Sequence, residues 1–356
     1  MNAIVGVALR GHPTTDVTQG RPQRAAPTKN SASARMFVGV TLVCTLMAAA
    51  FASWLPLQVS IVTLFLFAGP HNWFELRYFL MRLPVRFGRS RNFFLTAFAG
   101  LGVLTLTYVS LPFIYNAALW TDEAWSMIIA SWNTALLVWL ALLVWLRSRQ
   151  KPRANWIWTI PVGLALCSLN WLGPDLFSLA IVYVHPLIAL WFLDRHLRRT
   201  RPAWSQAYRR CLLLLPIVLI AMMWQLSGTS ALADDNGLFW RITQHSGAEV
   251  LPQVSSHMLV SVHLFLEMLH YGVWIIALPL IGRTATARFW ELQTVPVARH
   301  PKGFPRMVTG LLVFAVAAVV VLWLGFSIDY VTTRDVYFTV AIAHVLAEAP
   351  FLLRML

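Results

Sequence analysis

The chain has 356 residues, of which 58% are hydrophobic and only 12% are charged. Soluble domains contain about 25% charged residues, so this composition excludes an ordinary water-soluble enzyme. The net charge of +14 would suit a nucleic-acid-binding protein if the basic residues shared one face, but they fall in short clusters between long apolar runs. We therefore expect no nucleic-acid partner. The three cysteines have no CxxC spacing and indicate neither a disulfide framework nor a zinc ribbon.

Ten apolar runs are long enough to be membrane-spanning helices, which need roughly 20 mainly apolar residues to cross about 30 Å of hydrocarbon. The runs lie at 36–55, 58–76, 93–115, 125–146, 156–173, 175–194, 209–227, 254–281, 306–328 and 335–353. The polar residues 1–35 predict a disordered cytoplasmic tail, with an organelle transit peptide as the alternative. Residues 36–356 are predicted to form an all-α, polytopic membrane helix bundle with about ten transmembrane helices.

The basic residues predict the orientation, because Lys and Arg in short loops are retained on the cytoplasmic side. With both termini inside, 26 of the 28 Lys and Arg lie on that side, and only Arg241 and Arg334 lie in outside loops. We expect cytoplasmic N- and C-termini in an integral, multi-pass protein of the bacterial inner membrane. The segment 228–253 is the only sizeable outside loop and is interpreted as a surface connection.

Three of the six glutamates lie inside predicted spans, and each follows a histidine by four residues. The pairs are His71 and Glu75, His263 and Glu267, and His344 and Glu348. This spacing places both side chains on one helix face, and His270 extends the second pair along the same stripe. Ionisable groups within a bilayer are costly and usually mark function.

Several of these side chains are predicted to lie at a similar depth, between the membrane centre and the cytoplasmic face, together with a histidine of the sixth span. Neutral imidazoles and carboxylates are ligands for first-row metals, and helix bundles hold such sites in their cores. We therefore predict one shared metal site. Its candidate ligands are His71, Glu75, His185, His263, Glu267, His270, His344 and Glu348. Tyr271 follows a candidate ligand directly and is the candidate catalytic residue.

Structural roles are the alternative for some of these residues. His185 precedes Pro186 and could simply donate to a backbone carbonyl, and Glu75 could pair with Arg77 or Arg82. Glu267 and Glu348 have no Lys or Arg near their expected depth. A carboxylate could also orient a ligating histidine through a hydrogen bond without binding the metal itself. The histidines of predicted loops, His245 among them, are assigned no role.

A site of His and carboxylate without thiolate favours iron (Fe2+), with zinc as the alternative. Burial in hydrocarbon favours a lipophilic substrate such as a carotenoid, an isoprenoid, an acyl lipid or a quinone. We therefore expect a non-haem iron oxidoreductase of the oxygenase type, with dioxygen and an electron donor as further partners. If all candidates ligate, two irons fit; if only the imidazoles ligate, one iron fits.

The run PHNWFE at residues 70–75 resembles the Pro-His-Gly-x-x-Asp motif of the integral-membrane carotene dioxygenases related to the bacteriorhodopsin-related protein. Pro70 and His71 match, and Glu75 stands where that motif has Asp. The resemblance implies several intramembrane histidines around one iron and cleavage of beta-carotene to retinal. Asn72 replaces the glycine, and the chain has more predicted spans than that family.

Three other classes of protein remain open. A membrane zinc-dependent lipid hydrolase would use a metal-activated water, a haem protein would use two facing histidines, and a transporter would hold a midplane His/Glu site between repeats. A retinal-binding opsin is excluded, because the only lysines, Lys29, Lys151 and Lys302, lie in predicted loops or the tail. Prenyl-diphosphate chemistry is disfavoured because no span carries an Asp-rich pair.

Overall fold

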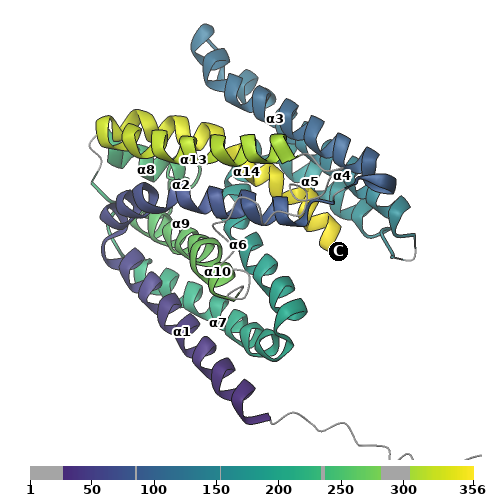
Figure 1. Ribbon diagram of the computed structural model, residues 1–356. Helices are drawn as coiled ribbons and strands as arrows, with labels where there is room; N and C mark the ends of the chain where they lie inside the picture. Colours follow the sequence, from purple (N-terminus) through teal and green to yellow (C-terminus); the bar gives the residue numbers. More distant parts are fainter. Residues whose placement is uncertain (1–26, 85, 153, 234–236, 282–304) are drawn as a thin grey trace, which may run out of the picture.

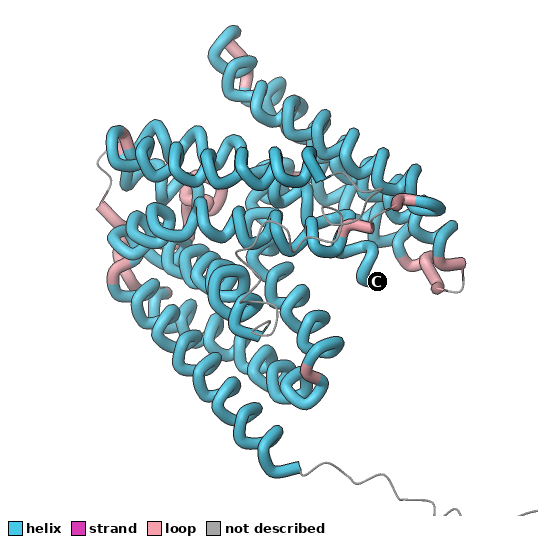
Figure 2. The backbone as a smooth tube through the Cα atoms, in the orientation of Figure 1, coloured by secondary structure: helices cyan, strands magenta, loops and turns pink. Residues whose placement is uncertain are grey.

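The computed structural model describes residues 27–84, 86–152, 154–233, 237–281 and 305–356, and these ranges are helical without any strand (Figures 1 and 2). The long helices are α1 (Pro27–Trp54), α2 (Pro56–Arg82), α3 (Arg91–Ala117), α4 (Asp122–Gln150), α5 (Thr159–Leu172), α6 (Pro174–Thr200), α7 (Pro202–Leu226), α9 (Ser256–Tyr271), α13 (Pro305–Ile328) and α14 (Tyr330–Met355). The shorter elements are η1 (Gly88–Ser90), α8 (Leu238–His245), η2 (Gly272–Ala277) and α10 (Leu278–Ile281).

Eight helices of the described part are long and apolar enough to cross a membrane, which confirms a multi-pass membrane helix bundle. Two further predicted spans form helices outside that set. The 14 residues of α5 extend only about 21 Å, less than the hydrocarbon thickness. The helix α2 is long enough, but its second half carries polar residues that lower its hydropathy. Those polar residues belong to the site described below.

The first helix begins earlier than the sequence predicts. Residues 27–35, which the sequence analysis assigned to a disordered tail, are the start of α1, and residues 1–26 lie outside the described part. A proline is tolerated in the first turn because its missing N–H has no helical partner there. The predicted cytoplasmic loop 283–306, which joins the eighth and ninth predicted spans and holds five Lys and Arg, also falls almost wholly outside the described residues.

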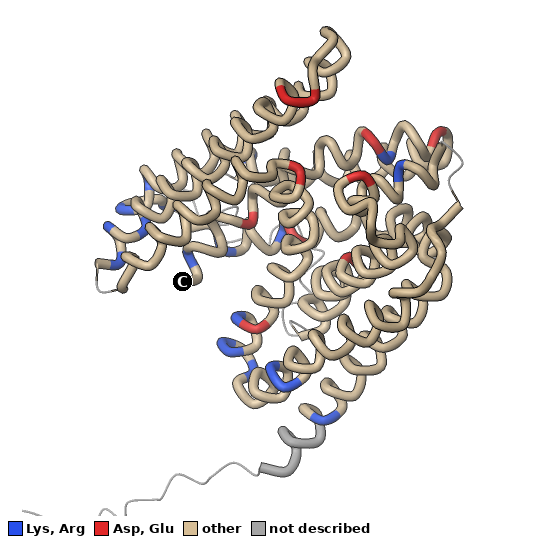
Figure 3. The backbone as a smooth tube through the Cα atoms, turned by 180° about the vertical axis from the view of Figure 1, so that it is seen from behind, with Lys and Arg blue, Asp and Glu red and all other residues tan. Residues whose placement is uncertain are grey.

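The cytoplasmic-facing ends predicted for α2, α4 and α14 do lie together. Arg147 near the end of α4 donates to the carbonyl oxygens of Leu353 and Arg354, at 3.1 and 2.8 Å. Arg354 in turn donates to the carbonyl of Arg82, at 2.6 Å. Guanidinium groups satisfy helix C-terminal carbonyls and complement the helix dipole. Many of the basic residues in Figure 3 lie at these helix ends, close to the C-terminus of the chain.

Close packing of α3 on α4 depends on a glycine. A Cβ built on Gly100 would clash with the indole ring of Trp139, whose N–H donates to the carbonyl of Thr96 at 3.0 Å. Trp139 is buried, so it has little room to move. Gly102, two residues further along α3, has nothing within 4 Å of its Cβ position. Only the first of these glycines is required by the helix contact.

Candidate metal centre

Four helices bring six of the predicted side chains together inside the bundle. The helix α9 packs against α2 and α6, and α14 contacts both of those helices; the four lie in the middle of the view in Figure 1. We call the resulting group the central cluster. It consists of His71 and Glu75 from α2, His185 from α6, His270 from α9, and His344 and Glu348 from α14.

The candidate ligand atoms of the central cluster are close to one another. Those of His71, Glu75, His270 and His344 lie within 4.8 Å of each other, and those of His185, His270 and Glu348 do so as well. His270 belongs to both sets and joins them. His71, Glu75, His270 and Glu348 are almost completely buried. A compact set of imidazole nitrogens and carboxylate oxygens in a bundle core suits a first-row metal ion.

Two of the imidazoles are held in a fixed tautomer. Nδ1–H of His71 donates to the carbonyl of Phe67 at 2.9 Å, and Nδ1–H of His185 donates to Oε2 of Glu348 at 3.1 Å. Metal-binding histidines nearly always donate their second ring N–H to a carbonyl or carboxylate in this way. The hydrogen bonds leave the Nε2 lone pairs of His71 and His185 available to a metal.

The distance between two imidazoles also fits a shared metal ion. Nε2 of His185 lies 3.1 Å from Nε2 of His344. Two nitrogens bound to one ion at about 2.1 Å would be about 3.0 Å apart at a right angle and about 3.4 Å apart at a tetrahedral angle. Two facing lone pairs at 3.1 Å repel each other unless a proton or a cation lies between them. The observed separation is that of an N–H···N hydrogen bond between the two rings, and it equally fits two ligands of one ion.

Several buried polar atoms of the central cluster make no hydrogen bond of normal geometry. They include Nε2 of His71, both ring nitrogens of His270, Nδ1 of His344 and both carboxylate oxygens of Glu75. Burying a polar group without a partner costs several kcal/mol in an apolar environment, and more for a carboxylate. A bound cation would satisfy many of these atoms at once.

Each of the four helices is irregular next to its cluster residue. Pro70 precedes His71, Pro186 follows His185, and Pro350 lies two residues after Glu348. In α9 the regular helix ends at Tyr271 and continues as the π-helical segment η2. A proline inside a helix removes one backbone hydrogen bond, and π-helical turns occur frequently at functional sites. Each of the four helices thus carries a feature that perturbs regular helix geometry close to its cluster residue.

A cavity of about 120 Å³ lies beside the cluster, and all four of its histidines line the wall. The carboxylates Glu75 and Glu348 do not line the cavity. Neither carboxylate therefore faces the cavity, and Glu348 hydrogen bonds to His185 instead. The cavity provides space for a small substrate group next to the candidate metal ligands.

The remaining predicted ligands form a separate group that also lines this cavity. His263 and Glu267, 3.9 Å apart between Nδ1 and Oε2, lie with His245 of α8, and we call these three residues the outer cluster. The sequence analysis placed His263 and Glu267 at the same site as His270. Seven residues of helix extend about 10.5 Å, so His263 and His270 share a stripe but lie at different depths.

His245 was missed because it lies in a segment interpreted as a surface connection. That segment forms the short helix α8, which is anchored by Leu238 and the buried Ile242 against Leu57 and Val260. His245 follows Ile242 by three residues and so occupies the same face, a signal that the sequence does contain. Burial, followed by the nearby His263 and Arg334, holds the pKa of His245 well below its usual range.

Arg334 corrects two sequence-based predictions. It was placed in an outside loop, and no basic residue was expected near Glu267. The helix α14 begins at Tyr330, so Arg334 lies inside the helix, is only 5% exposed, and is close enough to Glu267 and His263 for direct charge interaction. The side chain of Asp335 lies 3.9 Å from Arg334. A cation at the outer cluster would be repelled by this guanidinium, which weakens the case for a metal there.

Of the structural alternatives for Glu75, pairing with Arg82 is not found. A guanidinium nitrogen of Arg82 lies 3.2 Å from Nδ1 of His196, and its guanidinium stacks over the ring of Tyr78. The candidate catalytic residue Tyr271 packs its ring on His71, with 4.5 Å between centroids. Its hydroxyl interacts with that of Tyr337, which also accepts a hydrogen bond from Asn72.

Comparison of the chain with protein-family models, with curated proteins and with solved structures finds no match in any of the three. The resemblance of residues 70–75 to a carotene dioxygenase motif therefore stays a prediction. The function has to be argued from the central cluster and its surroundings.

Proposed function

We propose that the protein is an integral-membrane, non-haem iron oxidoreductase that acts on a lipophilic substrate. The observation that carries the proposal is the convergence of four imidazoles from α2, α6, α9 and α14, two of them held by Nδ1–H hydrogen bonds that leave Nε2 available. One ion bound by His71, His185, His270 and His344 would occupy Nε2 of His71 and one ring nitrogen of His270, which are buried and make no hydrogen bond. Glu75 is close enough to be a fifth ligand.

The composition of the donor set favours iron over zinc. Structural zinc sites use four ligands, often including thiolates, and catalytic zinc sites use three protein ligands. The central cluster offers four imidazoles and a carboxylate, and the free cysteines Cys44, Cys167 and Cys211 are not part of it. Iron supports one-electron and dioxygen chemistry, which would oxidise a substrate bound in the cavity. Dioxygen and an electron donor are the implied co-reactants.

The side chains around the ion have distinct roles in this proposal. Glu348 orients His185 through the 3.1 Å hydrogen bond, and the carbonyl of Phe67 orients His71. The apolar bundle excludes water, which protects a reactive site against side reactions. Tyr271 lies against His71 and lines the cavity, where it can contact a bound substrate.

A lipophilic substrate follows from the position of the site within membrane-spanning helices. We propose the topology predicted from the charges, with ten spans and both termini in the cytoplasm of a bacterium, although α5 is short for a complete crossing. The central cluster then lies in the hydrocarbon region. Carotenoids, isoprenoids and acyl lipids are substrates that partition into this region.

Elemental analysis of the detergent-purified protein, with an absorption spectrum of the same sample, tests the proposal. We expect about one iron per chain, no Soret band, and loss of the bound iron in His270→Ala and His344→Ala. His257→Ala is the matched control on α9, because the ring of His257 donates to the carbonyl of Ser53 at 2.9 Å and belongs to neither cluster. Stoichiometric zinc would favour a lipid hydrolase instead, and a Soret band would favour a haem protein. Absence of any metal after anaerobic reconstitution with iron would overturn the proposal and favour a transporter.

A further inference from the structure

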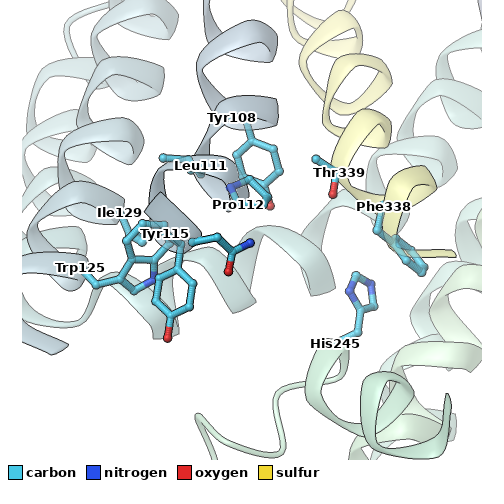
Figure 4. Close-up of a pocket in the computed structure, with 10 residues that line it drawn as sticks. Tyr108, Leu111, Pro112, Tyr115, Trp125, Ile129, His245, Phe338 and Thr339 are labelled. Atoms are coloured by element: carbon cyan, nitrogen blue, oxygen red, sulfur yellow. The ribbon is translucent and has the colours of Figure 1, made fainter. Parts of the chain in front are cut away.

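A second and larger cavity adjoins the one beside the central cluster. It has a volume of about 390 Å³, within the range of small-molecule sites, and lies between α3, α4, α8 and α14 (Figure 4). We call it the aromatic pocket. Its lining consists of Tyr108, Leu111, Pro112, Tyr115, Asn116, Trp125, Ile129, His245, Phe338 and Thr339. None of these residues is used by the proposed metal site.

The chemistry of the aromatic pocket suits an uncharged, apolar ligand. Among the described residues no Lys, Arg, Asp or Glu lines it, and most of its wall consists of aromatic rings and aliphatic side chains. Figure 4 shows the rings of Tyr115 and Trp125 on one side and those of His245 and Phe338 on the other. The rings of Tyr115 and Trp125 are in edge contact, with centroids 4.8 Å apart. Burial of a hydrocarbon chain against such walls is favourable by about 0.8 kcal/mol per CH₂ group.

Three residues connect the aromatic pocket to the cavity of the metal centre. Tyr108, His245 and Phe338 line both cavities. The rings of His245 and Phe338 are 3.9 Å apart between centroids and stand at this junction. A ligand long enough to pass these rings would therefore reach from the aromatic pocket to the four imidazoles.

The two volumes limit the shape of that ligand. The inner cavity, at about 120 Å³, is somewhat smaller than the roughly 150 Å³ cavity that holds benzene in an engineered protein. This volume accommodates a slender segment of a hydrocarbon chain, but not a bulky headgroup in addition to the chain atoms attached to it. The larger aromatic pocket can hold the rest of the chain.

The mouth of the aromatic pocket opens at the surface of the bundle. Pro112, Tyr115 and Asn116 at its rim are exposed, whereas Leu111 deeper inside is buried. The side chains of Leu106 and Phe113, which lie on α3 like these rim residues, are each 73% exposed, as expected for a surface in contact with lipid. A lipid in the surrounding leaflet would meet this mouth without passing through water.

We infer that the aromatic pocket binds the apolar tail of the substrate, and that this substrate is an elongated, single-chain lipid whose reacting segment lies in the inner cavity. The inference rests on the proposed function and names the substrate class of the same site. The side chains of the aromatic pocket then select the chain by its length and shape, while the central cluster performs the reaction.

Photo-crosslinking tests the inference directly. The probe is a long-chain fatty acid with a diazirine near the chain end, added to the purified full-length protein in detergent, with adducts located by peptide mass spectrometry. We expect adducts on the peptides that carry Tyr115, Ile129 or Thr339, and competition by the unmodified fatty acid. Adducts confined to outward-facing residues such as Leu106, or a labelling pattern that the competitor leaves unchanged, would overturn the inference.

A matched pair of variants on α4 adds a second readout. Ile129→Trp fills the aromatic pocket, whereas Met127→Trp adds the same bulk at a side chain that is 62% exposed on the outside of the helix. Exclusion of about two CH₂ groups should reduce pocket adducts roughly tenfold in Ile129→Trp and leave them unchanged in Met127→Trp. Equal labelling of the two variants would contradict the inference.

The iron content of the same samples separates the two proposals. Normal iron with no adducts in the pocket would overturn the tail site alone. Adducts in the pocket of a protein that binds no iron would overturn the proposed function while leaving a lipid site in place.

Discussion

The proposed function gives Glu348 the role of orienting the imidazole of His185 and not of binding the metal itself. Substitutions of Glu348 distinguish these two roles. Glu348→Ala removes the acceptor 3.1 Å from Nδ1 of His185 and leaves a buried N–H without a partner. Loss of such an orienting group typically lowers metal affinity by about 10- to 100-fold, or about 1.4 to 2.7 kcal/mol. Glu348→Gln keeps a carbonyl oxygen in place, so its loss should be smaller than about tenfold.

A double-mutant cycle with His185→Ala makes this prediction decisive. If Glu348 acts only through His185, it has nothing left to orient once the imidazole is gone. The double variant should then bind iron as weakly as His185→Ala alone, within about twofold. The iron affinity is measured by competition with a chromophoric chelator under anaerobic conditions, and gel filtration shows whether each variant is still monodisperse. An additional tenfold loss in the double variant would refute the reasoning and identify Glu348 as a direct ligand.

Three further predictions concern the rest of the structure. His263→Ala should leave the iron stoichiometry unchanged, since the outer cluster is separate from the central cluster and lies near Arg334. Loss of iron in this variant would show that one metal site spans both clusters. Gly100→Ala should lower the thermal unfolding temperature, because overpacking against Trp139 costs about 1 to 3 kcal/mol. Gly102→Ala is the control and should leave the unfolding temperature unchanged or raise it slightly, because its Cβ would meet open space and alanine favours the helix. Equal shifts would contradict the close contact. Glu249→Cys in a cysteine-free background should react with a membrane-impermeant maleimide on intact cells, and protection from the reagent would reverse the proposed topology.

The sequence by itself determined the helices and the residues that pair along each of them. Hydropathy can be judged for each segment alone, because a spanning helix satisfies its backbone hydrogen bonds within itself and its side chains contact only lipid or protein. The predicted runs therefore coincide with α2, α3, α4 and α13 to within a few residues, apart from extra turns at polar ends. The i, i+4 spacing likewise fixed that His71 and Glu75 share a face, as do His344 and Glu348.

Only the tertiary structure decided which of these faces meet, because helix periodicity fixes the direction of a side chain but not its neighbours on other helices. It joined His270 to His344 and left His263 about two turns away. The tertiary structure places His245 beside His263, although its segment was interpreted as a surface connection. It also places Arg334 beside Glu267. The aromatic pocket could not be predicted, since its walls come from three distant parts of the sequence, namely the consecutive helices α3 and α4, the helix α8 and the helix α14. Distances between helices depend on packing, and packing is not a property of any single segment.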